Sequence, residues 1–205
     1  RLVVSTPSDL SNNANLRAQV QPEHVLACLD SNSQLETRLA MAVAAPDLVH
    51  QKIATHAVSR PSSPAVLSVN GSTLTYKELT DQARYVQGVL SSLGIWPNDI
   101  VAAILPDGPA SVPVMLGTSG CCAYAPINRN VPASEFVRAL GRLRPKAVFC
   151  ERSMADVVSM HGITPLIVKE IGCGQVEIEG YDRSVALGSM LCPPDPGQIA
   201  LILQT

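Results

Sequence analysis

The stretch Asp99-Ile100-Val101-Ala102-Ala103-Ile104-Leu105-Pro106-Asp107-Gly108 decides the fold class. Its six consecutive apolar residues, 100–105, are typical of a strand that is buried on both faces. The turn that follows lies where a strand meets a helix, at the sheet edge where ligands usually bind. An ordinary loop is the simpler interpretation of Asp107-Gly108, and we prefer it.

Helical and extended patterns alternate on both sides of this stretch. Apolar residues recur at spacings of three and four from Leu79 to Leu93, which predicts an amphipathic helix that ends at Gly94. The other predicted helices are 46–58, one through 112–116, one from about 134 and 155–160; the other predicted strands are 65–69, 72–74, 122–125, 146–150, 166–168, an edge strand at 176–179 and 199–203. This order predicts an α/β fold with right-handed crossovers and a mostly parallel sheet that carries helices on both faces.

Two local signals support these boundaries. Asn70-Gly71 separates two short strands and predicts a hairpin turn in which both residues take positive φ. Thr75-Tyr76-Lys77-Glu78 is a capping box, in which the Thr75 hydroxyl and the Glu78 carboxylate each accept a backbone N–H of the other residue.

The composition excludes several classes of protein. Hydrophobic residues make up 46% of the 205, which is enough for a packed core and excludes disorder along the whole chain. The net charge of −2 favours neither nucleic acid nor an anionic membrane as a partner. No apolar run approaches the roughly 20 residues that span a bilayer, and residues 1–5 show no secretory h-region. We therefore expect a cytoplasmic protein.

The six cysteines and four histidines predict no metal site. None of the cysteines forms a Cys-x-x-Cys pair, and the histidines lack ligand spacing. The adjacent Cys121 and Cys122 have a reactive interpretation, but we interpret them as packed residues. The sequence also lacks a Gly-x-Gly-x-x-Gly fingerprint, a Walker-type loop and a Gly-x-Ser-x-Gly elbow, so these patterns alone indicate a scaffold without a mechanism.

The chain divides near residue 46. Residues 1–45 are rich in Ser, Asn, Gln and Ala and contain two short helical patterns. We predict that they form a partly helical leader or interdomain linker, and that the regular alternation of helices and strands starts at residue 46.

A family resemblance begins at the capping box. Leu74-Thr75-Tyr76-Lys77-Glu78-Leu79 resembles Leu-Thr-Tyr-x-Glu-Leu, the first core motif of the adenylate-forming superfamily, which holds nonribosomal peptide synthetase adenylation domains, acyl-CoA synthetases and luciferases. Residues 93–102 resemble the family's Leu-Gly-Val-x-x-Gly-Asp-x-Val-Ala, with Asn98 in place of Gly. Residues 122–128 resemble Gly-Ala-Tyr-Val-Pro-Ile/Leu-Asp, with Cys121-Cys122 in place of glycines and Asn128 in place of Asp. The resemblance covers about residues 46–205 and implies that they are the N-terminal part of an adenylation (AMP-binding) domain that is incomplete here.

The end of the sequence extends this resemblance. In the family, a strand similar to Ile199-Ala200-Leu201-Ile202-Leu203 leads into a Thr-, Ser- and Gly-rich loop that holds the ATP phosphates. Thr205 matches the first residue of that loop. The resemblance therefore implies that Thr205 and Gln204 lie at the ATP phosphates and that the 205 residues alone are inactive.

The resemblance implies an ATP- and Mg²⁺-dependent ligase. It would activate a carboxylic or amino acid as an acyl-adenylate and transfer the acyl group to a phosphopantetheine thiol. Tyr124 and Asn128 lie in a motif that can approach the thiol donor in acyl-CoA synthetases, although we prefer a structural role for both. The capping-box residues are also assigned a structural role, and no catalytic residue is assigned within the chain.

Three interpretations of the function remain open. The leader and the opening helix favour an adenylation domain that serves a carrier protein beside neighbouring synthetase domains. The Ala125-Pro126-Ile127-Asn128 variant and the helix around Glu135-Phe136 favour a free-standing acyl-CoA ligase. A non-catalytic scaffold or binding module is the alternative from another class. The acid that is activated cannot be read from these residues.

Overall fold

The computed structural model describes residues 2–5, 48–184 and 197–204, and the helical patterns predicted within 1–45 lie outside these ranges. None of the helices within the described ranges is long and apolar enough to cross a membrane.

A seven-stranded sheet forms the centre of the fold, with the strand order β1-β9-β5-β4-β6-β7-β8. All neighbouring strands run parallel except β7 and β8, which run antiparallel. The strands are β1 (Leu2–Ser5), β4 (Ile100–Ile104), β5 (Ala123–Pro126), β6 (Ala147–Cys150), β7 (Thr164–Gly172), β8 (Gln175–Ile178) and β9 (Leu201–Gln204). The prediction of a mostly parallel sheet is confirmed.

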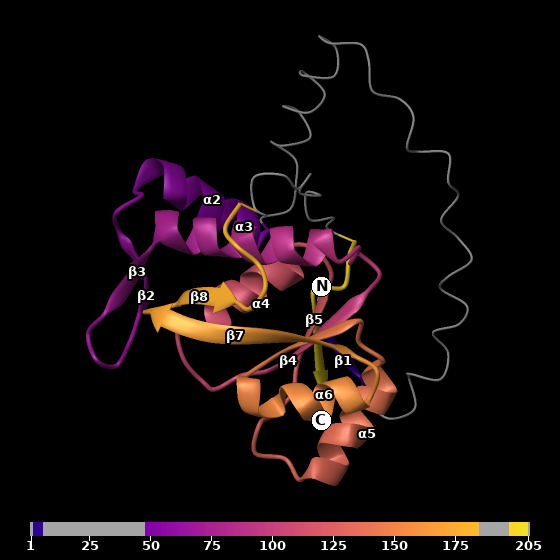
Figure 1. The fold of residues 1–205 in the computed structure, drawn as a ribbon. Helices are drawn as coiled ribbons and strands as arrows, with labels where there is room; N and C mark the ends of the chain where they lie inside the picture. Colours follow the sequence, from indigo (N-terminus) through magenta and orange to yellow (C-terminus); the bar gives the residue numbers. More distant parts are fainter. Residues whose placement is uncertain (1, 6–47, 185–196, 205) are drawn as a thin grey trace.

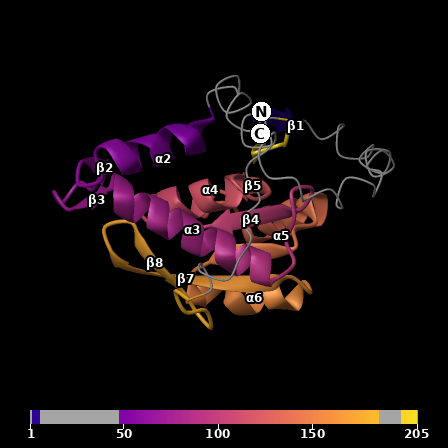
Figure 2. The same ribbon diagram turned by 90° about the horizontal axis from the view of Figure 1, so that it is seen from above.

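Helices cover both faces of the sheet (Figures 1 and 2). One layer contains α2 (Val49–Ser59), α3 (Tyr76–Ser92) and α4 (Ser111–Ser119), and the other contains α5 (Ala133–Leu143), α6 (Ala155–Met160) and the short 3-10 helix η4 (Arg152–Met154). The central strand β4 contributes side chains to the cores on both faces of the sheet, because successive side chains of a strand point to opposite faces. Val101 packs in the core beneath α3 and α4, whereas its neighbour Ala102 packs in the core against α5.

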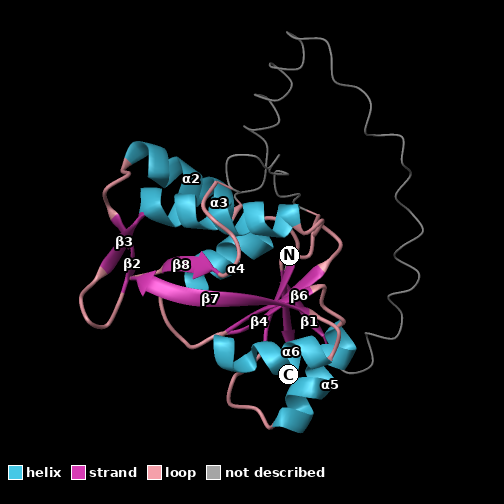
Figure 3. Ribbon diagram, in the orientation of Figure 1, coloured by secondary structure: helices cyan, strands magenta, loops and turns pink. Residues whose placement is uncertain are grey.

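The hairpin of β2 (Pro64–Leu67) and β3 (Thr73–Thr75) stands apart from the sheet (Figure 3). The prediction of positive φ at both turn residues is wrong for Asn70. Gly71 has a φ of 85°, and Asn70 is not among the residues with positive φ. The N–H of Gly71 donates to the Ser68 carbonyl and that of Ser68 to the Ser72 carbonyl, which gives a three-residue loop that needs only one left-handed residue.

The predicted boundaries of α3 are confirmed. Thr75 caps the helix with both hydrogen bonds of the capping box, and Gly94 follows the last turn with a φ of 65°. Asn98 sits in a turn that the N–H of Asp99 closes by donating to the Trp96 carbonyl. Its φ is not positive, so the replacement of the family's Gly requires no strained backbone.

Two features of the sheet differ from the sequence-based prediction. Strand β7 extends over nine residues, because Val168 to Gly172 pair with β8, which is the edge strand predicted at 176–179. Strand β1 was not predicted, and it pairs in parallel with β9 from Leu2↔Leu201 to Ser5↔Gln204. A four-residue strand that pairs with residues 199 positions away carries too little local pattern to be found in the sequence.

The outer edge of β8 is covered by two polar side chains of α3. Gln82 Oε1 accepts the N–H of Val176 at 3.1 Å, and the Tyr85 hydroxyl accepts the N–H of Ile178 at 3.0 Å. The same hydroxyl donates to the carbonyl of Tyr181 at 2.8 Å. Both side chains are buried. The helix thus satisfies backbone groups that an edge strand would otherwise leave open to another chain.

Candidate functional site at the carboxyl edge of the sheet

The chain diverges at the carboxyl ends of β4 and β5. After β4 it turns into α4 on one face of the sheet, and after the neighbouring β5 it turns into α5 on the other face (Figure 1). Ligands bind at such points in open parallel sheets, because the diverging loops leave a crevice outside the strand ends. The loops that follow β4 and β5 therefore mark the candidate site.

Asn128 is exposed in the loop after β5. Its Oδ1 accepts the N–H of Asn130 at 2.9 Å, and its carbonyl accepts the N–H of Val131 at 3.4 Å. This side-chain turn needs only an oxygen acceptor, which Asn and Asp both supply. The change from the family's Asp to Asn128 therefore preserves the local geometry.

Tyr124 is not brought to this exposed edge. It is 5% exposed and belongs to the core beneath α3 and α4. Burial raises the pKa of its hydroxyl to about 12. The side chain thus packs inside the domain, as the structural interpretation requires, and its approach to a thiol donor stays a prediction.

The end of β9 lies beside the end of β5. Tyr124 pairs with Leu201, so three residues further along each strand the backbone of Gln204 falls level with Ile127. This places Gln204 one residue from the level of Asn128, at the carboxyl edge. Thr205 lies outside the described residues, and the roles of both residues toward ATP stay predictions.

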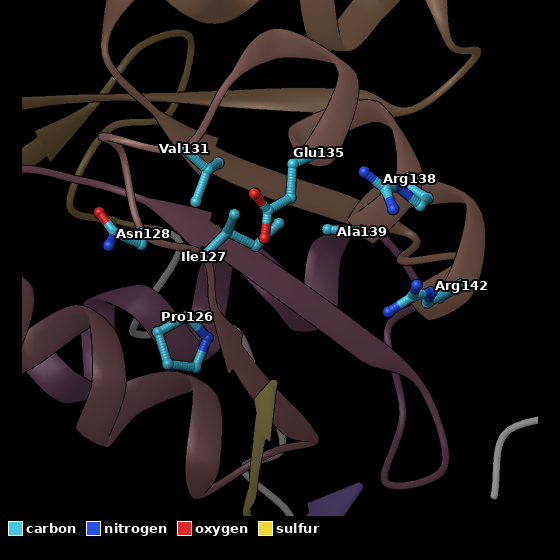
Figure 4. Close-up of a pocket in the computed structure, with 8 residues that line it drawn as sticks. All are labelled: Pro126, Ile127, Asn128, Val131, Glu135, Arg138, Ala139 and Arg142. Carbon is cyan, nitrogen blue, oxygen red and sulfur yellow. The ribbon is translucent and has the colours of Figure 1, made fainter. Parts of the chain in front are cut away.

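A shallow pocket of about 120 Å³ opens between the end of β5 and α5 (Figure 4). Ile127 and Ala139 are buried and provide apolar surface, with Val131 and Pro126 beside them. The polar lining is Asn128, Glu135, Arg138 and Arg142. Residues 135, 138 and 142 follow one face of α5, since they are three and four positions apart.

Figure 4 shows the guanidinium groups of Arg138 and Arg142 on one side of the pocket and the Glu135 carboxylate close to Ile127. Both arginines are exposed, and neither has an ion-pair or hydrogen-bond partner among the described residues. This pocket was not predicted from the sequence. Two arginines one helical turn apart, just after the 122–128 motif, were the signal that could have indicated it.

Ion pairs join the neighbouring loops of the same edge. Arg129, after β5, pairs with Glu151, after β6, at 3.2 Å. Arg152 of η4 pairs with Glu179, which follows β8. Because all four side chains are well exposed, these pairs align the loops and add little stability.

The other residues that the sequence singled out are Cys121, Cys122 and Asp107. Cys122 is fully buried, and its hydrogen bond with Cys121 together with burial raises the pKa of its thiol. Asp107 is exposed in its loop. Within the described ranges no group of three or more His, Cys, Asp or Glu residues could hold a metal ion.

Comparison with known proteins identifies the fold and the family together. The profile of the family described as "AMP-binding enzyme" matches residues 53–205, which is three quarters of the chain. The chain belongs to the AMP-binding enzyme family. This match starts within α2 and includes every strand of the central sheet except β1.

The relatives of this AMP-binding chain come from two branches. Phenyloxazoline synthase MbtB from Mycolicibacterium paratuberculosis is 29% identical over 162 residues, which are 78% of this chain and 13% of that protein. The medium/long-chain-fatty-acid–CoA ligase FadD6 from Mycobacterium tuberculosis is 25% identical over 146 residues, which are 62% of this chain and 24% of the ligase. The chain thus spans a quarter or less of the length of these relatives.

A solved structure of the nonribosomal peptide synthetase FmoA3 has the same fold. It superimposes with a TM-score of 0.60 at 23% identity, over 75% of this chain and 16% of the synthetase. At this identity the likeness supports the fold of the AMP-binding chain and not its substrate.

Proposed function

We propose that the complete enzyme containing this chain activates a carboxylic or amino acid with ATP and transfers the acyl group to the phosphopantetheine thiol of a carrier protein. The observation that carries the proposal is the family match over residues 53–205, which covers all three sequence motifs. A cytoplasmic location stays a prediction from the sequence.

The sheet explains how this chain would contribute to the reaction. ATP would supply the adenylyl group, with Mg²⁺ neutralising phosphate charge. The chain's own part is to hold the end of β9 beside the end of β5, so that the residues after Gln204 start from the carboxyl edge. A loop anchored by a buried strand at one side can present its N–H groups to an anion in a fixed position.

The choice of acceptor separates the two enzymatic interpretations. The likeness to MbtB, a phenyloxazoline synthase of which the chain covers 13%, supports a longer synthase that serves a carrier protein. The likeness to FadD6 supports the second candidate, a free-standing acyl-CoA ligase. These two interpretations imply the following partners: a small carboxylic or amino acid, a carrier protein or CoA, and neighbouring synthetase domains.

Substrate-dependent exchange between ATP and pyrophosphate tests the first half-reaction. We expect the complete enzyme to show exchange with at least one acid from a panel of amino, aryl and fatty acids. Exchange with none of them would contradict adenylation and favour the non-catalytic scaffold.

The second half-reaction is tested with the acid found in the exchange assay. We expect a thioester on a phosphopantetheinylated carrier protein, measured by intact-protein mass spectrometry, with much slower formation of the CoA thioester. The reverse preference would replace the proposed function with that of an acyl-CoA ligase.

A further inference from the structure

Helix α5 presents two positive charges that the described part of the fold leaves without a partner. Arg138 and Arg142 are one turn apart, and both guanidinium groups lie beside the pocket in Figure 4. By contrast, the nearby Arg129 and Arg152 are each paired with a glutamate. An exposed guanidinium pair at this spacing matches carboxylates that are also one helical turn apart.

Apolar and polar side chains share the surface beside the arginines. Ile127, at 8% exposure, and Ala139, at 6%, lie at the bottom of the pocket, and Val131 and Pro126 lie beside them. A hydrophobic centre with charges at its rim is the usual arrangement of a protein–protein contact. The pocket of about 120 Å³ has room for one side chain of a partner.

The position of Glu135 favours a protein over a nucleotide as the ligand of this pocket. Its carboxylate lies near Ile127 in the same pocket, where it would repel a phosphate group. A helix can instead carry a basic or neutral residue opposite Glu135 and acidic residues opposite the two arginines. The mixed charge of this face therefore favours a polypeptide over a polyphosphate.

We propose that α5 and this pocket form the docking surface for an acidic helix of the carrier protein, with one apolar side chain of that helix inserted between Ile127 and Ala139. This inference rests on the proposed function. The surface is continuous with Asn128, so a partner docked there brings its thiol arm to the carboxyl edge of the sheet.

The test compares the complete wild-type enzyme with its Arg138→Glu/Arg142→Glu variant. Thioester formation is measured against the concentration of a phosphopantetheinylated carrier protein, and again with CoA as acceptor. We expect the KM for the carrier protein to rise by about tenfold or more, because two attractions become repulsions, while kcat and the KM for CoA stay within about twofold. Arg138→Gln/Arg142→Gln should give a smaller rise in the same direction.

Arg84→Glu is the matched control, since Arg84 is an exposed arginine on α3, in the other helix layer. It should leave all of these constants unchanged. Exchange between ATP and pyrophosphate reports separately on adenylation, so a failure of the proposed function is recognised by its absence in the wild type. In that case the docking surface is still tested by the affinity of the carrier protein for the wild type and for the double variant, measured by fluorescence anisotropy.

Three results would overturn the docking surface. The first is a KM or affinity for the carrier protein that is equal in the wild type and the double variant. The second is an equal loss with Arg84→Glu, which would indicate a non-specific effect of charge. The third is an equal rise in the KM for CoA, which would assign the arginines to a phosphate group.

Discussion

Glu78 shows how one carboxylate stabilises the start of a long helix. Its Oε2 accepts the N–H of Thr75 and the Thr75 hydroxyl, both at 2.8 Å, and the Thr75 hydroxyl accepts the N–H of Glu78 at 3.3 Å. The hydrogen bonds from Thr75 lower the pKa of Glu78. Because its pKa is lower in the folded state, the stabilisation is complete above the unfolded value of about 4.3 and is lost as the pH falls through the folded value.

Replacement of Glu78 by Gln separates the charge from the geometry, since Gln can also complete a capping box. We expect Glu78→Gln to lower the free energy of unfolding by about 0.5–1 kcal/mol at pH 7, and the difference from the wild type to vanish in acid. Urea denaturation between pH 7 and pH 3 measures it. A difference that does not change with pH would contradict the role of the charge. A second variant, Thr75→Ala, removes the cap itself and should lower the free energy of unfolding by about 1 kcal/mol at pH 7.

At the scale of elements, α3 and α4 approach closely at Gly117. A Cβ at this position would lie 2.5 Å from the Cβ of Val86 and 2.7 Å from the carbonyl oxygen of Ala83. Both are parts of α3 that cannot move without shifting the helix, so the contact requires glycine.

We expect Gly117→Ala to destabilise the protein by about 2 kcal/mol or more, as overpacking in a close contact does. Gly141→Ala is the matched control, because Gly141 lies in the exposed part of α5 and its Cβ would meet no atom within 4 Å. The control should stabilise by about 0.5–1 kcal/mol through the helix propensity of Ala. Thermal unfolding measures both, and equal effects of the two changes would disprove the close packing.

Tyr85 links α3 to the edge strand β8 at the same scale. We expect Tyr85→Phe to lower the free energy of unfolding by about 1–3 kcal/mol, since it leaves the N–H of Ile178 buried without an acceptor. Amide hydrogen exchange should show faster exchange at Ile178 and unchanged exchange in β4. Unchanged protection at Ile178 would mean that the hydroxyl does not hold the edge.

At the scale of the whole molecule, the chain covers only a small part of the length of its relatives. It spans 13% of MbtB and 16% of FmoA3. Its described residues offer no metal-binding cluster, and the residue matched to the ATP-phosphate loop is Thr205.

We therefore expect the 205 residues alone to show no exchange between ATP and pyrophosphate with an acid that the complete enzyme activates. The complete enzyme under the same conditions is the positive control. Exchange by the isolated chain above the rate without protein would show that the residues needed for adenylation lie within it.

The sequence by itself determined the α-helices and most of the strands of the described residues, the mostly parallel sheet and the family. The periodicity from Leu79 to Leu93, the capping box at Thr75 and the apolar run 100–105 are local, and each one alone favours its element. The Asn70-Gly71 prediction was wrong in detail because a three-residue loop satisfies the hairpin with one left-handed residue.

Only the tertiary structure decided which of these residues meet. It placed Tyr124 in the core and Asn128 at the surface, paired β1 with β9, covered the edge of β8 with Gln82 and Tyr85, and set Arg138 and Arg142 beside Ile127. These outcomes depend on the order of the strands and on which face of the sheet each helix covers. Both are set by contacts between residues far apart in the chain, which a local pattern cannot specify.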